Sequence, residues 1–331
     1  MNQFTPVLHS VSYASAWPGH SFLDVDAFLN KAVELGYRSI ALVAKRPHVS
    51  PLDYDEAARR KLRTRIEELG LELAAMMGYS DFTAGLEHPG IPSAEMNAAY
   101  VGAVAKLAAD LGTKRVRIFT GYSKPQLGYD TQYGEVVKGI RLAAREASRY
   151  GITLVVQNHH DIASHHQQFA WLLDEVNEPN VKAAFDAWAP FLQGLSGEDL
   201  VRAVESVGSR IEFTTVADYV IQPQFRYDPG HVNYVREESA LVRAVAPGTG
   251  QVDYESFFRG LRSAGYGGPV AYEMCATLQG GGSLENLDRT ARHFLQFMAK
   301  MNGDQAPSGP DHVAKASVRE PATQTHLLTT P

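Results

Sequence analysis

The chain has 331 residues, of which 44% are hydrophobic and 21% charged, with a formal net charge of −6. This length supports one large core or two smaller ones, and the acidic balance argues against nucleic acid or a membrane surface as partner. A single cysteine, Cys275, excludes an internal disulfide framework and suggests a reducing, cytoplasmic environment. The first residues lack the features of a signal peptide, and no apolar run approaches the ~20 residues that span a bilayer.

Short β-branched runs and amphipathic segments alternate along the chain. In chain order we expect strand 7–13 and helix 24–35, strand 39–44 and helix 55–69, strand 71–77 and helix 93–111, strand 115–120 and helix 133–150, strand 152–158 and helix 167–176, strand 181–186 and helix 197–207, strand 211–216 and helix 254–264, and strand 269–274 and helix 284–301. Several helices are followed by a glycine, such as Gly36 and Gly112, as is typical of a helix C-terminus before a strand.

Strict alternation predicts a parallel sheet with helices outside it. Eight units over about 300 residues favour a closed (β/α)₈ TIM barrel, forming a single domain over residues 1–301. An open doubly wound sheet is the alternative, but no Gly-x-Gly-x-x-Gly follows the first strand.

Two regions exceed a minimal barrel. Residues 220–250 form a long insertion after the seventh strand, rich in tyrosine and arginine, for which a lid, a binding loop, or a contact with a second copy or partner subunit are the open interpretations. Residues 302–331 are polar and without apolar periodicity, which predicts a disordered tail.

Polar side chains stand where the predicted strands end, which is where barrel active sites lie. Gln157, Asp186 and Glu273 stand at the C-terminal ends of the fifth, sixth and eighth predicted strands. Their oxygens suit a divalent metal such as Mn²⁺ or Mg²⁺, which would stabilise an enediolate. The alternative is that these strand ends only bond to each other or to loop backbone.

Other residues near the strand ends have more than one interpretation. Because neighbours in a strand point to opposite faces, His159 shares the side of Gln157 and is the candidate acid/base, whereas His160 is expected to pack against helices. Cys275 is expected to be an inert core residue.

We predict four substrate-binding residues: His9, Arg117, Trp188 and Arg226. Trp188 can form an apolar platform for a sugar ring, or can simply fill the mouth of the barrel. Arg226 can contact a polar substrate, or can brace its loop through salt bridges.

Four segments, at residues 150–159, 184–186, 244–254 and 265–273, together resemble the xylose isomerase-like TIM barrels, the sugar phosphate isomerase/epimerase and endonuclease IV-like superfamily. The resemblance covers about residues 5–300. It implies one divalent metal held by Glu, Asp, His and Glu from strands five to eight, with the two glutamates also moving the proton. This chain matches at Asp186 and Glu273 but has Gln157 for the first glutamate and Thr215 for the histidine.

These departures change the expected chemistry. An amide is not a general base near neutral pH, so a symmetric epimerisation by two glutamates is disfavoured. We expect Gln157, Asp186 and Glu273 to hold the metal and His159 and Glu273 to act as catalytic residues; a barrel that has lost its metal is the rival.

The first functional hypothesis is therefore a metal-dependent sugar isomerase or epimerase acting on a sugar or keto-sugar. Lyase- or hydrolase-like cleavage of a keto-glycoside, including C-glycosides, is an alternative, and a non-catalytic sugar-binding barrel is another. DNA repair is disfavoured because the chain is acidic and the ligand set is sparse.

Overall fold

The computed structural model describes residues 3–88 and 90–304. Within these residues, eight parallel strands close into a barrel in the order β1-β10-β7-β6-β5-β4-β3-β2. The strands are β1 (Thr5–His9), β2 (Ser39–Val43), β3 (Glu72–Met77), β4 (Arg115–Ile118), β5 (Thr153–Gln157), β6 (Val181–Ala184), β7 (Ile211–Val216) and β10 (Pro269–Tyr272). The predicted TIM barrel is confirmed.

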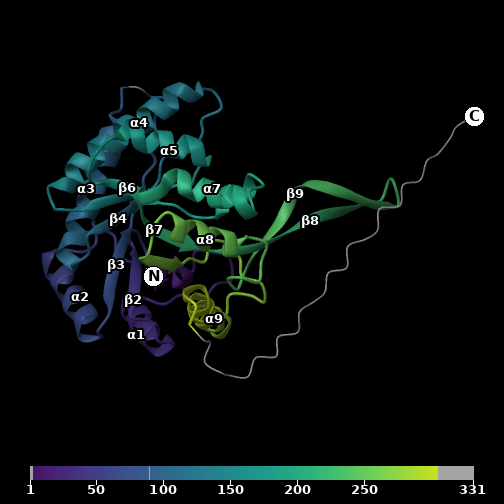
Figure 1. The fold of residues 1–331 in the computed structure, drawn as a ribbon, viewed down its shortest axis with the longest axis horizontal. Helices are drawn as coiled ribbons and strands as arrows, with labels where there is room; N and C mark the ends of the chain where they lie inside the picture. Colours follow the sequence, from purple (N-terminus) through teal and green to yellow (C-terminus); the bar gives the residue numbers. More distant parts are fainter. Residues whose placement is uncertain (1–2, 89, 305–331) are drawn as a thin grey trace, which may run out of the picture.

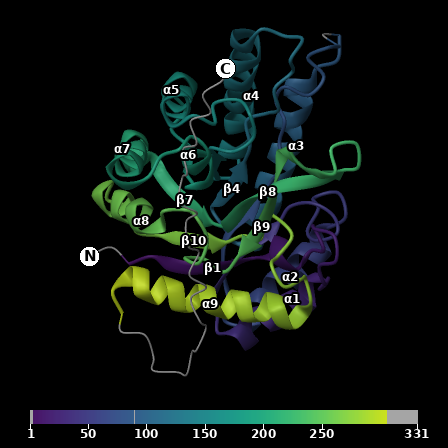
Figure 2. The same cartoon turned by 90° about the vertical axis from the view of Figure 1, so that its right-hand side faces the viewer.

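Helices surround the barrel (Figure 1), and Figure 2 shows the last helix lying alongside β1. They are α1 (Val25–Leu35), α2 (Glu56–Glu68), α3 (Ser93–Leu111), α4 (Tyr129–Ser148), α5 (His166–Val176), α6 (Trp188–Leu192), α7 (Gly197–Val207), α8 (Tyr254–Ser263) and α9 (Leu284–Asn302), with two 3₁₀ turns, Ser10–Tyr13 and Gly208–Arg210. Helix α1 illustrates the local signals: the Asp24 side chain accepts from the Ala27 N–H, and Gly36 ends the helix at φ 92°. Among the described residues, no helix is long and apolar enough to cross a membrane.

Some predicted boundaries were wrong. The first strand ends at His9, because the His9 ring accepts from the Val11 N–H and turns the chain into a 3₁₀ helix. Helix α4 begins at Tyr129, four residues before the predicted start. Helix α9 extends to Asn302, whose side-chain amide bonds to both backbone groups of Phe4. Most of the predicted tail, residues 305–331, lies outside the described residues.

The insertion after the seventh strand is a long antiparallel hairpin rather than an irregular loop. It consists of β8 (Asp218–Asp228) and β9 (Asn233–Val245) and projects away from the barrel (Figure 1); we call it the arm. Pro223 and a register shift beside it interrupt the alternating pattern, which hid the strand in the sequence.

The barrel interior explains where the strand-end side chains point. Residues from several strands fill the interior in one apolar cluster, among them Val7, Val155, Phe213 and Ala271. Side chains two positions apart in a strand share a face. The residues two positions further on therefore also point inward, at the C-terminal mouth: His9, Gln157, Thr215 and Glu273.

Candidate active site at the C-terminal mouth of the barrel

A pocket opens at the mouth between the ends of β5, β6, β7 and β10. Its lining residues are Gln157, His159, Asp186, Trp188, Thr215, Ala217, Tyr219, Tyr254, Glu273 and Cys275. A larger surface groove lies between α1 and α2 and is lined by residues such as Tyr54 and Leu62, but by none of the strand-end residues. The chemistry available to this fold therefore lies in the mouth.

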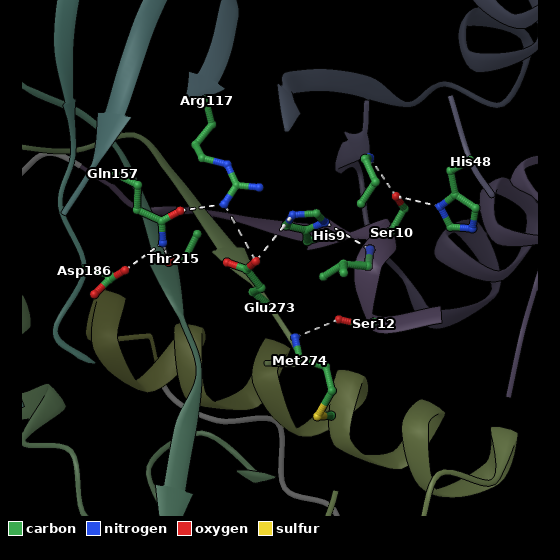
Figure 3. A network of polar contacts seen from close by, with 12 residues as sticks. His9, Ser10, Ser12, His48, Arg117, Gln157, Asp186, Thr215, Glu273 and Met274 are labelled. Carbon is green, nitrogen blue, oxygen red and sulfur yellow. Dashed lines mark hydrogen bonds and ion pairs between the residues drawn. The ribbon is translucent and has the colours of Figure 1, made fainter. Parts of the chain in front are cut away.

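A chain of hydrogen bonds crosses the site from β4 to β7 (Figure 3). Arg117 Nη1 donates to Gln157 Oε1 at 2.6 Å, and Gln157 Nε2 donates to Asp186 Oδ2 at 2.7 Å and to Thr215 Oγ1 at 3.2 Å. Because a guanidinium can only donate and a carboxylate readily accepts, these two neighbours fix which end of the Gln157 amide faces which way. The amide therefore links the cation to Asp186.

Glu273 lies beside the same guanidinium nitrogen that bonds to Gln157 (Figure 3). Its Oε1 is 4.0 Å from Arg117 Nη1 and 3.8 Å from His9 Nε2. At 4 Å, opposite unit charges attract by about 4 kcal/mol at an effective dielectric constant near 20. Arg117 and His9 are completely buried, so the fold places a charged side chain and an imidazole at the centre of the barrel.

The hydrogen bond at the other ring nitrogen sets the tautomer of His9. His9 Nδ1 accepts from the Val11 N–H at 3.0 Å, so the proton of the neutral ring is on Nε2, facing Glu273. Burial, and then the nearby Arg117, lower the pKa of His9 well below its usual value, which keeps the ring neutral.

Burial also shifts two groups that line the pocket. It raises the pKa of Asp186 to about 6, although the hydrogen bond from Gln157 opposes this shift. Burial lowers the pKa of His159, and the charge of Glu273 partly opposes it. Near neutral pH, His159 is therefore a neutral imidazole beside a carboxylate.

The three predicted metal ligands come together, but their arrangement does not fit a divalent ion. The oxygen of Gln157 is occupied by Arg117, and its N–H₂ group faces Asp186. Turning the amide would leave the guanidinium facing a donor and the carboxylate facing an oxygen. Among the described residues, no group of three or more His, Cys, Asp or Glu side chains is placed to hold a metal.

The other predicted site residues are placed as follows. Trp188 lines the pocket and packs on Tyr219 with ring centroids 4.0 Å apart. His160 is outside the pocket lining and stacks on Tyr122, with centroids 4.1 Å apart. Arg226 is not brought to the mouth: it lies on the arm, exposed, and pairs with Glu237 on the opposite strand at 3.0 Å.

Tyr219 and Tyr254 line the pocket but were not singled out from the sequence. Tyr254 hydroxyl donates to the Ala217 carbonyl at 2.7 Å and accepts from its N–H at 3.0 Å, which shapes the bend between β7 and the arm. Tyr219 follows Asp218 and enters the pocket because of that bend. A tyrosine three residues after the seventh strand was the available signal for Tyr219, whereas Tyr254 starts a helix and gave none.

Comparisons with known proteins agree with this geometry. Residues 29–301 match the family model described as xylose isomerase-like TIM barrel. Hydroxypyruvate isomerase of Escherichia coli K12 is 25% identical over 179 residues, which are 52% of this chain and 60% of that enzyme, so the match spans less than two thirds of the relative.

Solved structures share the fold at low sequence identity. D-psicose 3-epimerase from Clostridium cellulolyticum H10 has a TM-score of 0.67 at 16% identity, with 90% of this chain and 99% of that chain covered. A 3-keto-D-glucoside 4-epimerase from E. coli has a TM-score of 0.64 at 15% identity, with 90% and 100% covered. The family model matches most of the chain, and the observed fold is the closed barrel that its description names. The chain therefore belongs to the xylose isomerase-like TIM barrel family.

Proposed function

We propose that this protein is an isomerase- or epimerase-like enzyme that acts on a sugar or keto-sugar by proton transfer at the carbon next to a carbonyl, through an enediolate. The observation that carries the proposal is the meeting of Glu273 and His159 in one pocket at the barrel mouth, beside Asp186 and Trp188. The names of the relatives, one isomerase and two epimerases, support the same reaction class.

In this proposal Glu273 is the base. Its carboxylate takes the proton from carbon, and the neutral imidazole of His159 donates a hydrogen bond to the carbonyl oxygen as negative charge develops there. Thr215 hydroxyl accepts from Gln157 and so keeps its own hydrogen to donate into the same pocket. Gln157 only positions its neighbours, because an amide does not take up a proton near neutral pH.

The site has one carboxylate base where a symmetric epimerase needs a group on each face of the carbon. A single base can carry a proton between adjacent carbons on one face of an enediolate, which favours isomerisation over inversion. His159 is the candidate for a second acid/base in the pocket.

The same asymmetry favours a second candidate, cleavage of a keto-glycoside. Glu273 would take the proton next to the ketone and then give it to the leaving oxygen or carbon, while the neutral His159 ring donates a hydrogen bond, so that a single carboxyl group is sufficient. The keto-glucoside substrate in the name of one structural relative is consistent with this substrate class.

Trp188 and Tyr219 would bind the apolar face of the sugar. Their rings pack together at one wall of the pocket, and Tyr219 is only 3% exposed, so the wall is rigid. An aromatic surface beside a few fixed polar groups is the usual composition of a small-molecule site.

The test is deuterium exchange. The full-length protein is incubated in D₂O with a panel of ketoses, aldoses and keto-glycosides, and NMR follows deuterium at the carbon next to the carbonyl and the products formed. Glu273→Gln should lower the rate by ~10²–10⁴-fold, whereas Glu212→Gln, near the N-terminal end of β7 and paired with Arg115, should not change it. Equal rates for Glu273→Gln and the wild type would contradict the proposal, and sugar binding without exchange or product would favour the non-catalytic barrel.

We also propose that the arm contacts a second copy of the chain. Cross-strand pairing places Tyr227 opposite Tyr234 and Phe225 opposite Arg236, so three aromatic rings share one face, and these rings are 58%, 49% and 66% exposed at Phe225, Tyr227 and Tyr234. A two-stranded ribbon is marginally stable alone, and an aromatic face can pair with its own copy about a two-fold axis.

Light scattering after size exclusion tests the arm. The wild type should elute as a dimer or larger, and the triple replacement of these rings by serine should give a monomer with an unchanged circular dichroism spectrum. A wild-type monomer, or an oligomer unaffected by the replacement, would refute the role of the arm.

A further inference from the structure

We infer that the guanidinium of Arg117 takes the place and the charge of a divalent cation in this site, so that the proton transfers proposed above run without a bound metal. This inference rests on the proposed function, and it concerns a residue that the sequence indicated only as a substrate contact. Figure 3 shows the guanidinium reaching from β4 to the point between Gln157 and Glu273.

The first argument is the direction of the Gln157 amide. Arg117 occupies its only oxygen at 2.6 Å, and the amide nitrogen is used by Asp186 and Thr215. A divalent ion on the second lone pair of this oxygen would lie beside the guanidinium, and the two positive charges would repel each other.

The second argument is the local charge. Asp186 and Glu273 both line the pocket, and two cations act on Glu273. Arg117 Nη1 lies 4.0 Å from Glu273 Oε1. Burial and the charge of Arg117 lower the pKa of Lys45, and the charge of Glu273 opposes this shift, so Lys45 also lies within the field of that carboxylate. The carboxylates are therefore already balanced, and a divalent ion would add two positive charges beside these two.

The third argument is that Arg117 has no alternative place. Its side chain is completely buried, and the guanidinium carbon lies 4.0 Å from the centre of the Phe119 ring. Within the described part of the chain, its Nε and Nη2 have no hydrogen-bond partner, so the bond from Nη1 to Gln157, the aromatic rings and the charge of Glu273 are what hold it. Moving the guanidinium away would leave a buried cation unpaired and the Gln157 oxygen without its donor.

The consequence for catalysis is a fixed positive field where negative charge develops. Arg117 does not line the pocket, so it acts on the reaction through Gln157 and Glu273 and is a positioning residue. A cation built into the fold needs no loading and does not exchange with solvent.

The experiment is a titration with Mn²⁺ alone. Full-length protein is dialysed against EDTA and titrated with Mn²⁺, and the free ion is read by electron paramagnetic resonance. Four proteins are compared: wild type, Gln157→Glu, the double variant Arg117→Met/Gln157→Glu, and Glu273→Gln. Circular dichroism confirms that each is folded.

The wild type and Gln157→Glu should bind Mn²⁺ only weakly, since the new carboxylate pairs with Arg117. The double variant should bind about one ion per chain, at least ~10-fold more tightly than either of these two proteins. Changes to the groups that hydrogen-bond to metal ligands alter metal affinity by about this factor. Gln157→Glu is the matched control, because it supplies the missing carboxylate and keeps the guanidinium.

Tight binding of one Mn²⁺ by the wild type, lost in Glu273→Gln, would overturn the inference. A double variant that binds no more tightly than Gln157→Glu would also overturn it, because the guanidinium would then not be what prevents the ion from binding. If the double variant does not fold, the wild-type titration still tests the inference, because tight binding of one Mn²⁺ would overturn it and weak binding would support it. The readout is independent of turnover, so a failed search for a sugar substrate counts against the proposed function alone.

Discussion

The carboxylate of Asp218 organises the backbone at the base of the arm, and replacing it with asparagine gives the sharpest stability prediction. The side chain is 1% exposed and accepts four backbone N–H groups. Oδ1 accepts from Tyr219 at 2.9 Å and Val252 at 3.3 Å, and Oδ2 accepts from Gly248 and Gly250, each at 2.8 Å. One carboxylate therefore ties the start of β8 to the segment that leads into α8.

Asp218→Asn replaces one oxygen with an N–H₂ group of the same size. In either orientation two backbone N–H groups lose their acceptor and face a donor. Each buried unsatisfied N–H costs about 1–3 kcal/mol. Part of this cost is offset, because burial raises the pKa of Asp218 and the variant no longer buries a charge. We expect a net loss of about 3 kcal/mol in the free energy of unfolding.

At roughly 2 cal/mol/K per residue over about 300 residues, this loss corresponds to a fall of about 5 °C in Tm. The assay is thermal and urea unfolding followed by circular dichroism at pH 7.5. Asp228→Asn is the matched control, since that carboxylate also accepts a backbone N–H, from Gly230 at 2.8 Å, but in an exposed turn at the tip of the arm. A loss below about 1 kcal/mol for Asp218→Asn, or an equal loss for both variants, would refute the reasoning.

Three further predictions concern a buried histidine, the pocket wall and a helix contact. Burial lowers the pKa of His48, so its contribution to stability is present above the unfolded pKa near 6.5 and is lost as the pH falls through the folded value. The Tm should therefore fall on acidification below pH 6.5, and it should fall less in His48→Gln, whose amide keeps both hydrogen bonds of the ring. Parallel curves of Tm against pH for the wild type and the variant would contradict this. Trp188→Ala should raise KM by up to ~10-fold with a smaller change in kcat, as expected for one lost aromatic contact, and an unchanged KM in steady-state kinetics would exclude the platform. A Cβ added at Gly139 would lie 2.2 Å from the Phe82 ring, so Gly139→Ala should destabilise the protein by about 1–3 kcal/mol. Gly134→Ala is the control in the same helix, since a Cβ there would have nothing within 4 Å, and it should not destabilise the protein. Equal Tm values for the two variants would show that the Phe82 ring moves aside.

The sequence was sufficient for the architecture. Alternation of apolar runs with amphipathic segments is set by local periodicity, and Ser93–Leu111, Gly197–Val207 and Ile211–Val216 have the predicted bounds. The period of two in a strand also fixed which side chains enter the mouth, which is why Gln157, Asp186 and Glu273 line one pocket as expected.

Contacts between residues far apart in the chain were decided by the tertiary structure. The turn of the arm carries a local signal, Pro229-Gly230, but the pairing of its long flanking strands does not follow from that signal, and Pro223 concealed β8. Arg226 is in the arm, so its position follows from where the hairpin projects and not from its place after the seventh strand.

The sequence alone determined that this protein is a (β/α)₈ barrel with acid, amide and imidazole side chains at the mouth, because periodicity and strand ends are local properties. Only the tertiary structure decided what those side chains do to each other. The bond between Arg117 and Gln157 spans 40 residues, and it exists because β4 and β5 are neighbours in register, with Arg117 beside Val155. Whether an amide oxygen faces a guanidinium or an open ligand position depends on such neighbours, and periodicity along one strand carries no information about them.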